Sequence, residues 1–197
     1  WTFLQLAAGY VIGRMIVSGF LAYGAERIYI TARKAQACDE AAAELTKIGP
    51  GKVISLPGDI STLEGVEKLA AELKGREEKL DILVNNAGAA WAADFEEFPE
   101  KGWDKVVDLN LKTPFFLTKA LAPLLRKAAT KERPAKVINI ASIDGIFVNP
   151  LETYPYAASK AGLIHLSRRM AVRLIKENIV ATAIEPGPFQ SDMNIDA

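Results

Sequence analysis

The sequence predicts a doubly wound α/β fold, in which helices cover both faces of a mostly parallel sheet. Short apolar runs rich in β-branched residues alternate with longer segments that have helical spacing of apolar residues. The connections are short, and no shift in composition marks a second domain. We therefore expect a single domain over residues 1–197.

The strands are predicted from runs typical of a buried parallel sheet. A weaker run opens the chain at 1–6, and clearer ones follow at 27–31, 52–56, 80–86, 136–142 and 179–185. Helices are predicted where apolar residues return every three or four positions, at 12–22, 35–48, 63–78, 103–128 and 156–176. Right-handed crossovers favour a doubly wound order, and such sheets bind ligands at the carboxyl ends of their strands.

The composition excludes several classes of protein. Lys plus Arg and Asp plus Glu number 24 each, so no net basic field would attract nucleic acid. No apolar run approaches the ~18 residues that cross a bilayer, and no signal peptide is recognisable. One cysteine, Cys38, excludes an internal disulfide, and one histidine, His165, leaves little for a metal site. We expect a cytoplasmic protein without metal or membrane.

Small polar residues and glycines follow each predicted strand, as in "PGDIS", "NNAG", "ASIDG" and "EPGPFQSDM". Turns favour these residue types, which explains any one segment but not their particular identities. "YPYAASK" is more specific, because Tyr156 and Lys160 lie four apart and share a helix face. A nearby ammonium would lower the pKa of the tyrosine, which could then exchange a proton with an alkoxide.

Two further residues add to this pair. Ser142 ends the preceding strand, and its hydroxyl could hydrogen bond the same substrate oxygen. Asn110 falls inside the predicted helix 103–128, where asparagine is a poor helix former. It either faces solvent or holds a water beside the lysine. Tyr154 is a wall of a substrate pocket or a surface residue.

In this order and spacing, "LVNNAG", "LNLKTPF", "INIASIDG", "YPYAASKAG" and "PGPFQS" resemble the motifs of short-chain dehydrogenases/reductases over essentially the whole chain. The resemblance implies a Rossmann-type sheet that binds NAD or NADP and a site that reduces carbonyls or oxidises alcohols. It assigns Asn110 to a water-mediated proton relay and Ser142 to polarising the carbonyl. Tyr156 would be the general acid/base, and Lys160 would lower its pKa and hold the nicotinamide ribose.

The same motifs imply the residues that contact the cofactor. Asp59 and Ile60 would flank the adenine, Asn86 would contact the adjoining ribose, and Ser191 would help to seat the nicotinamide carboxamide. The other expected cofactor contacts in these motifs are Ala87, Gly88, Pro186 and Gly187. About 20 residues beyond the glycine loop, an NAD-binding protein has an acidic residue, and this chain has Arg33. An arginine fits a 2′-phosphate, so the sequence predicts NADP (as NADPH) over NAD.

The phosphate loop departs from the family pattern. Thr-Gly-x-x-x-Gly-x-Gly falls on residues 6–13 and matches only at Gly13, although Gly9 could supply a shifted turn beside Ile12. Val11 would intrude at the helix N-terminus and resists positive φ. Two explanations stay open: the protein has lost tight cofactor binding, or this stretch of sequence is imperfectly assigned.

Residues 101–146 are similar to bacterial 3-oxoacyl-(acyl carrier protein) reductases, including the rhamnolipid-biosynthesis branch. This implies a small-molecule or acyl-carrier-bound ketone, with Phe147, Phe189 and Trp91 as candidate pocket walls, although single aromatics are most often core. The alternatives are another alcohol, sugar or polyol dehydrogenase of the family, or a cofactor-free binding or scaffold protein of the same fold.

Two expectations concern assembly and length. The helices 103–128 and 156–176 carry more apolar residues than one sheet face buries, which predicts a homotetramer or dimer. The chain stops at Ala197 without the last helices and strand of the family pattern, which indicates a truncated chain.

Overall fold

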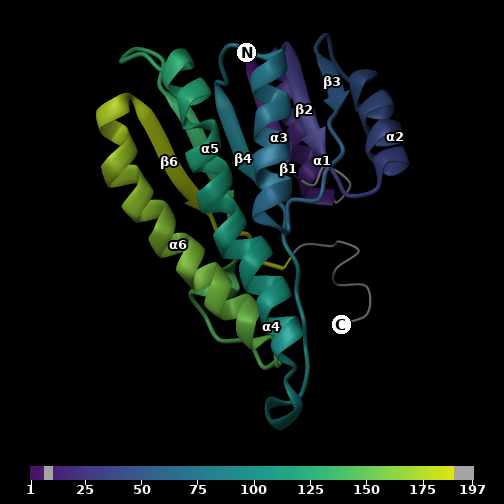
Figure 1. Cartoon of the computed structure of the whole chain (residues 1–197), viewed down its shortest axis with the longest axis vertical. Helices are drawn as coiled ribbons and strands as arrows, with labels where there is room; N and C mark the ends of the chain where they lie inside the picture. Colours follow the sequence, from purple (N-terminus) through teal and green to yellow (C-terminus); the bar gives the residue numbers. More distant parts are fainter. Residues whose placement is uncertain (7–10, 189–197) are drawn as a thin grey trace.

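Six parallel strands form one sheet in the order β3-β2-β1-β4-β5-β6 (Figure 1). The computed structural model describes residues 1–6 and 11–188. The strands are β1 (Thr2–Leu6), β2 (Arg27–Thr31), β3 (Lys52–Ser55), β4 (Ile82–Asn85), β5 (Ala135–Ile140) and β6 (Ile179–Ile184). The predicted doubly wound sheet is confirmed, and each predicted strand is present within two residues at either end.

The helices alternate with the strands. They are α1 (Val11–Ala22), α2 (Ala35–Thr46), α3 (Leu63–Arg76), α4 (Glu100–Val107), α5 (Thr113–Ala128) and α6 (Tyr154–Leu174). Short 3₁₀ turns cover Phe95–Glu97, Ile143–Gly145 and Ile175–Glu177. Helix α6 begins two residues before its predicted start because Pro155 suits a first helical turn. Asn178, at φ 56°, ends the segment in the left-handed region.

The strand order reverses between β1 and β4, at the centre of the sheet. The chain runs outward from β1 to β3 and then returns to β4, which pairs with β1 through Phe3 opposite Ile82. In sheets of this kind the crevice beyond the carboxyl ends of these central strands is where ligands bind. The residues that follow β1, β2, β4 and β5 are therefore expected to line the ligand site.

Two apolar cores hold the layers together. Helices α3, α5 and α6 pack on one face, where Leu73, Leu121 and Met170 meet strand residues such as Leu83. This face is toward the viewer in Figure 1. Helices α1 and α2 pack on the other face, where Val17, Leu21 and Leu45 join one buried cluster with strand side chains. These are Phe3, Ile28, Ile30, Val53, Ile82, Val84 and Ile140.

Helices cover both faces of the sheet as predicted, but at β6 only one face is covered in the described residues. Ile179 and Ala181 are buried under α6, whereas Val180 and Ile184 on the opposite face are 38% and 48% exposed. The cover formed by α1 and α2 therefore does not extend over the β6 side of the described sheet.

The long helix predicted over 103–128 is present from Glu100 to Ala128, but it is not one regular α-helix. The structure has α4, then a π-helical turn over Asp108–Lys112 (hereafter the π turn), then α5. A π turn inserts one extra residue per turn, which rotates the side chains that follow and is frequent at functional sites. Here it contains Asn110, and the rotation turns this residue inward.

Candidate active site

Ser142 lies directly beyond β5 and is positioned by the turn that follows it. Its hydroxyl accepts a hydrogen bond from the Asp144 backbone N–H at 3.2 Å and so caps the turn Ile143–Gly145. This turn packs on the backbone of α6: a Cβ at Gly145 would lie 2.7 Å from the backbone nitrogen of Ala161. Glycine is therefore required, and the close approach brings Ser142 to Tyr156, with which it hydrogen bonds.

Tyr156 and Lys160 lie together on the predicted face of α6. Lys160 Nζ lies 5.5 Å from the centroid of the Tyr156 ring and donates to the Ile140 carbonyl at 2.8 Å. Lys160 is 4% exposed, and this burial lowers its pKa to about 8 because the ammonium is removed from water. An amine that titrates this close to neutral pH can both hold and release a proton.

The predicted lowering of the Tyr156 pKa is not what the structure has. Burial raises the pKa of Tyr156, and the charge of Asp144 acts in the same direction, while the Ser142 hydrogen bond lowers it. Removal of the phenolate from water is the largest cause and exceeds the effect of the hydrogen bond. Tyr156 in the protein alone is therefore a protonated group, suited to giving a proton.

Asn110 does not face solvent, so that alternative is wrong. It is 1% exposed, and its Oδ1 accepts from the Ala89 backbone N–H at 2.8 Å. Its Nδ2 donates to the Ala89 carbonyl at 2.9 Å and to the Ser159 hydroxyl at 3.1 Å. The π turn is thus tied both to the loop after β4 and to α6.

Gly88 brings the loop after β4 to the same place. A Cβ at Gly88 would lie 3.4 Å from Asn110 Oδ1 and 3.7 Å from Lys160 Nζ. The bare backbone therefore stands beside two of the four predicted catalytic residues. Asn86 and Ala87, before it, are half-buried where the loop leaves β4.

The predicted adenine end lies beyond β2 and β3. Hydrogen bonds from Ser61 hold the pKa of Asp59 below its ordinary value, and the charge of the exposed Arg33 acts in the same direction. Ile60 is buried, and its carbonyl accepts from the Thr113 hydroxyl at 2.7 Å. Arg33, Asp59 and Ile60 therefore share one end of the site, which Thr113 ties to the start of α5.

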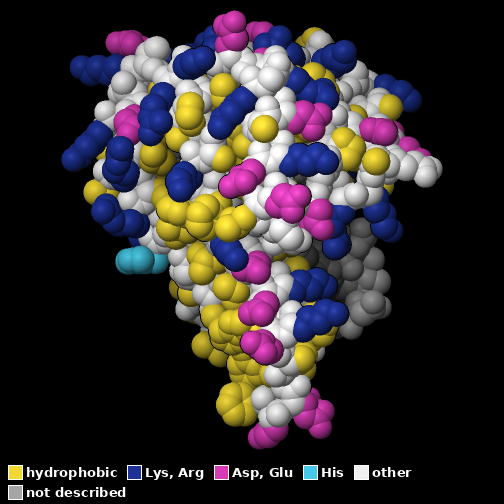
Figure 2. Space-filling view, in the orientation of Figure 1, with side chains coloured by type: hydrophobic (Ala, Val, Ile, Leu, Met, Phe, Trp, Pro, Cys, Tyr) yellow, Lys and Arg dark blue, Asp and Glu magenta, His cyan; other side chains and the backbone are white. Residues whose placement is uncertain are grey.

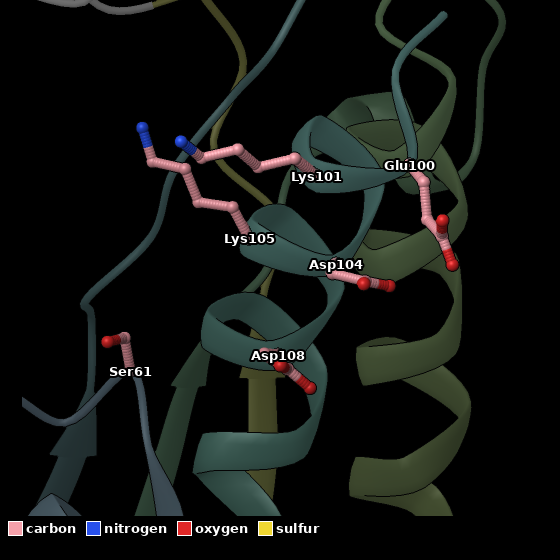
Figure 3. A pocket seen from close by; sticks show the side chains of 6 residues that line it. All are labelled: Ser61, Glu100, Lys101, Asp104, Lys105 and Asp108. Atoms are coloured by element: carbon pink, nitrogen blue, oxygen red, sulfur yellow. The ribbon is translucent and has the colours of Figure 1, made fainter.

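Two hollows border this end. One, of about 240 Å³, is lined by Asp59 together with residues from the start of α3. A larger one, of about 600 Å³, lies between Ser61 and α4, and Figure 3 shows Lys101 and Lys105 extending to the side on which Ser61 lies. Glu100, Asp104 and Asp108 point away from that side. None of the four predicted catalytic residues lines either hollow.

The remaining cofactor residues are placed only in part. Gly9, Phe189 and Ser191 lie outside the described residues. Val11 and Ile12 begin α1 and Gly13 is buried in it, and among the described residues Asn178 is the only non-glycine with positive φ. Val11 is therefore helical, and the predicted conflict with positive φ does not arise. Pro186 accepts from the Ile143 N–H at 3.0 Å, and Gly187 follows it on the surface.

The candidate substrate walls surround the same end of the sheet. Trp91 lies against Gly102 of α4, with Lys105 Nζ 5.2 Å from its ring centroid, and Phe147 is 64% exposed. Tyr154 packs edge-on against Phe95 and Phe98, at 5.5 and 5.8 Å between centroids. Ala93 N–H also donates to the Glu152 carbonyl, at 3.4 Å, so the loops after β4 and β5 contact each other.

These two loops form a surface of apolar and acidic side chains at the lower end of the molecule (Figure 1, Figure 2). Figure 2 shows apolar and acidic side chains together there, where the loop before α4 lies in Figure 1. Residues 86–99 and 143–153 contain no lysine or arginine. Their carboxylates are Asp94, Glu96, Glu97, Asp144 and Glu152.

Buried polar residues that were not predicted from the sequence support the site through hydrogen bonds. Ser159 is 1% exposed and bonds Asn110, and its place within "YPYAASK" was the available signal. A second chain of buried hydrogen bonds runs from Asn85 through Asn139 to Ser167, each at 2.8 Å. Nothing in the hydrophobic pattern predicts that these polar side chains point into the core.

Within residues 1–6 and 11–188, no helix is long and apolar enough to cross a bilayer. In the same ranges no cluster of three acidic, histidine or cysteine side chains could hold a metal ion.

The chain is similar to proteins of known activity along most of its length. A rhamnolipids biosynthesis 3-oxoacyl-[acyl-carrier-protein] reductase of Pseudomonas aeruginosa is 44% identical over 182 residues, which are 92% of this chain and 70% of that protein. A 2-dehydro-3-deoxy-D-gluconate 5-dehydrogenase of Escherichia coli is 36% identical over 148 residues, covering 75% of this chain and 56% of that protein.

A solved structure of the Pseudomonas aeruginosa RhlG/NADP active-site complex matches with a TM-score of 0.93 and 42% identity. The match covers 98% of this chain and 74% of that chain. The family model described as short chain dehydrogenase matches residues 4–197. The chain belongs to the short-chain dehydrogenase family.

Proposed function

We propose that this protein uses NADPH to reduce a ketone of the 3-oxoacyl type to an alcohol, with Tyr156 as the general acid. The observation that carries the proposal is the convergence of Ser142, Tyr156, Lys160 and Asn110 beyond the carboxyl ends of β4 and β5. The names of the similar proteins, a 3-oxoacyl reductase and an NADP complex, support the same reaction.

The described residues fit a dinucleotide. Gly88 leaves the backbone bare beside Lys160, and hollows flank the loop that carries Asp59 and Ile60. Arg33 would hold the 2′-phosphate and Lys160 the nicotinamide ribose. The other proposed contacts are Gly9, Ile12, Gly13, Asn86, Ala87, Pro186, Gly187 and Ser191. When bound, NADPH supplies the hydride that reduces the carbonyl carbon.

The protein's own residues move the proton. The Ser142 hydroxyl donates a hydrogen bond to the carbonyl oxygen, and Tyr156 gives that oxygen its phenolic proton as negative charge develops. The raised pKa of Tyr156 keeps the proton in place until then. Lys160 and a water held at Asn110 then return a proton to the phenolate.

The charge of the loops after β4 and β5 supports a small, uncharged substrate over a carrier-bound one. The Glu152 hydrogen bond and the charges of Glu152, Glu96 and Asp94 raise the pKa of Tyr154, so these carboxylates lie close together. Asp144 acts in the same way on Tyr156 itself. A phosphate-bearing carrier arm would approach the five carboxylates of these loops, whose own residues include no lysine or arginine, although Lys105 of α4 lies beside Trp91.

A similar NAD-dependent glycerol dehydrogenase of Listeria innocua favours a second candidate, the oxidation of a polyol or sugar alcohol. Titration of NADPH fluorescence with the protein, followed by NADPH consumption with a neutral 3-oxoester, tests the proposal. Binding and consumption are expected. Binding without consumption, together with NADP⁺-dependent oxidation of a polyol, would favour the second candidate. Absence of binding would favour a cofactor-free binding protein of the same fold.

We also propose that the chain forms a homodimer or homotetramer through α4, α5 and α6. Exposed apolar side chains on these helices support this assembly: Trp103 is 44%, Phe115 40% and Val172 63% exposed. Exposed apolar side chains that gather on neighbouring helices mark sites of association between proteins.

A further inference from the structure

Ser159 stands between two of the predicted catalytic residues without itself facing the substrate side. It lies on α6 immediately before Lys160 and is 1% exposed. Its hydroxyl donates to the Tyr156 carbonyl at 2.8 Å and accepts from Asn110 Nδ2 at 3.1 Å. Ser159 therefore links the side-chain amide of Asn110 to α6 through hydrogen bonds.

The side-chain amide of Asn110 uses its full donor capacity in these contacts. One N–H goes to the Ala89 carbonyl and the other to Ser159, while Oδ1 accepts from the Ala89 N–H. Without the Ser159 hydroxyl, one amide N–H would remain buried without an acceptor. A buried N–H without an acceptor is unfavourable, so the amide and the π turn would shift to find a new partner.

We propose that Ser159 is a positioning residue that fixes Asn110, and with it the π turn, in one position relative to α6. This proposal rests on the proposed function, in which Asn110 and Lys160 return the proton to Tyr156. Since Ser159 and Lys160 are neighbours on one helix, the hydrogen bond couples the position of Asn110 to that of the lysine. Ser159 acts through Asn110 and does not touch the reacting atoms.

The same helix contains a matched control. Ser167 is 2% exposed, donates to the Leu163 carbonyl at 2.7 Å and accepts from Asn139 Nδ2 at 2.8 Å. Both serines thus accept from a buried asparagine and donate to their own helix. Only the asparagine bonded to Ser159 belongs to the predicted proton relay.

The test compares Ser159→Ala, Ser159→Cys and Ser167→Ala in the full chain. In the protein without nucleotide, we measure hydrogen–deuterium exchange at the Ala89 amide, whose N–H is bonded to Asn110 Oδ1. Both Ser159 variants should accelerate this exchange and Ser167→Ala should not. Thiols are weak acceptors, so Ser159→Cys separates loss of the hydrogen bond from loss of volume.

Turnover gives the second readout. Ser159→Ala should lower kcat for ketone reduction about ten-fold and leave KM for NADPH within about two-fold, because the lost bond acts on proton return and not on binding. Ser167→Ala should keep the parent kcat even if its melting temperature falls equally. The proposal would be overturned if the Ser159 variants left the Ala89 exchange or kcat unchanged. It would also be overturned if Ser159→Ala and Ser167→Ala lowered kcat equally.

A parent that reduces no ketone would refute the proposed function instead. In that case the exchange measurement still decides whether Ser159 positions Asn110.

Discussion

Lys160 Nζ lies 5.5 Å from the centroid of the Tyr156 ring and points to the carbonyl of Ile140, at 2.8 Å. The ammonium is therefore anchored to the end of β5 beneath the tyrosine and has no carboxylate partner among the described hydrogen bonds and ion pairs. Its position depends on the strand, and its charge on the pH.

Tyr156→Phe should abolish turnover and leave the fold intact. The phenolic hydroxyl is the proposed proton donor, and loss of a positioned general acid costs on the order of 10²-fold or more in kcat. Steady-state NADPH consumption and thermal melting measure the two effects.

Tyr154→Phe is the matched control, since this ring keeps its packing against Phe95 and Phe98 and loses only the hydrogen bond to Glu152. It should retain kcat. A Tyr156→Phe protein with near-normal kcat would exclude the proposed acid.

The sequence predicted the strands well because each of them is an apolar run that is buried in the structure. The apolar spacing of 103–128 continues through the π turn, so periodicity gave no sign that the helix divides at Asp108–Lys112. The inward position of Asn110 depends on that extra residue. Its partners Ala89 and Ser159 lie 21 and 49 positions away, beyond the range of any local pattern.

The electrostatics of the pair were predicted from sequence spacing alone and were wrong for Tyr156. Spacing indicates that an ammonium lies near the ring, but not how deeply the ring is buried. Burial is the largest cause of the raised pKa of Tyr156, and Asp144 contributes through a turn that the spacing could not place.

Lys160→Met should change how the free energy of unfolding depends on pH. The pKa of Lys160 is about 8 in the folded protein and 10.5 for an ordinary lysine exposed to water, so between these pH values the unfolded chain binds the extra proton. The free energy of unfolding of the parent therefore rises with pH across this window, by on the order of 3 kcal/mol relative to Lys160→Met. The cost of burying the charge is fully present below pH 8.

Urea unfolding of both proteins at several pH values from 7 to 11 measures the difference. Tyr29, whose pKa burial raises to about 12, titrates in both proteins and cancels. Lys68→Met, on the exposed side of α3, should reproduce the parent curve. If the curve of Lys160→Met runs parallel to that of the parent, Lys160 does not titrate as described.

Arg33→Ala should reduce the preference for NADPH over NADH. Arg33 is exposed at the end of β2, beside Asp59, and a guanidinium can form charge-assisted bonds to a 2′-phosphate that NADH lacks. The value of kcat/KM for NADPH should fall about 10- to 100-fold, with NADH little changed. The neighbouring Lys34→Ala should have a smaller effect. Equal use of both cofactors by the parent, or equal losses in the variant, would refute the assignment.

Trp103→Glu should dissociate the assembly. Trp103 is 44% exposed on α4. Lys101 and Lys105 of this helix form one row, and Asp104 with Asp108 of the π turn form a second (Figure 3). In a dimer with two-fold symmetry, the lysine row of one copy can face the aspartate row of the other copy. Light scattering of the parent should give a multiple of the 21.4 kDa chain, and the variant a single chain. Tyr23→Glu, 86% exposed beyond α1, should leave the mass unchanged. A monomeric parent at micromolar concentration would contradict the prediction.

A 3-oxoacyl group should be reduced faster on a neutral thiol than on coenzyme A. The N-acetylcysteamine and coenzyme A thioesters share the reacting group and differ in phosphate charge, which must pass the carboxylates of the loops after β4 and β5. We expect kcat/KM to favour the neutral thioester about ten-fold at low salt. Added salt should reduce this difference in kcat/KM because it screens exposed charges.

Neutralising Asp94, Glu96 and Glu152 as Asn, Gln and Gln should raise kcat/KM only for the coenzyme A thioester, since these groups lie together around Tyr154. Glu40→Gln with Glu67→Gln, exposed on α2 and α3, should change neither substrate. Equal use of both thioesters at every salt concentration would remove the charge argument and leave a carrier-bound substrate as the better assignment.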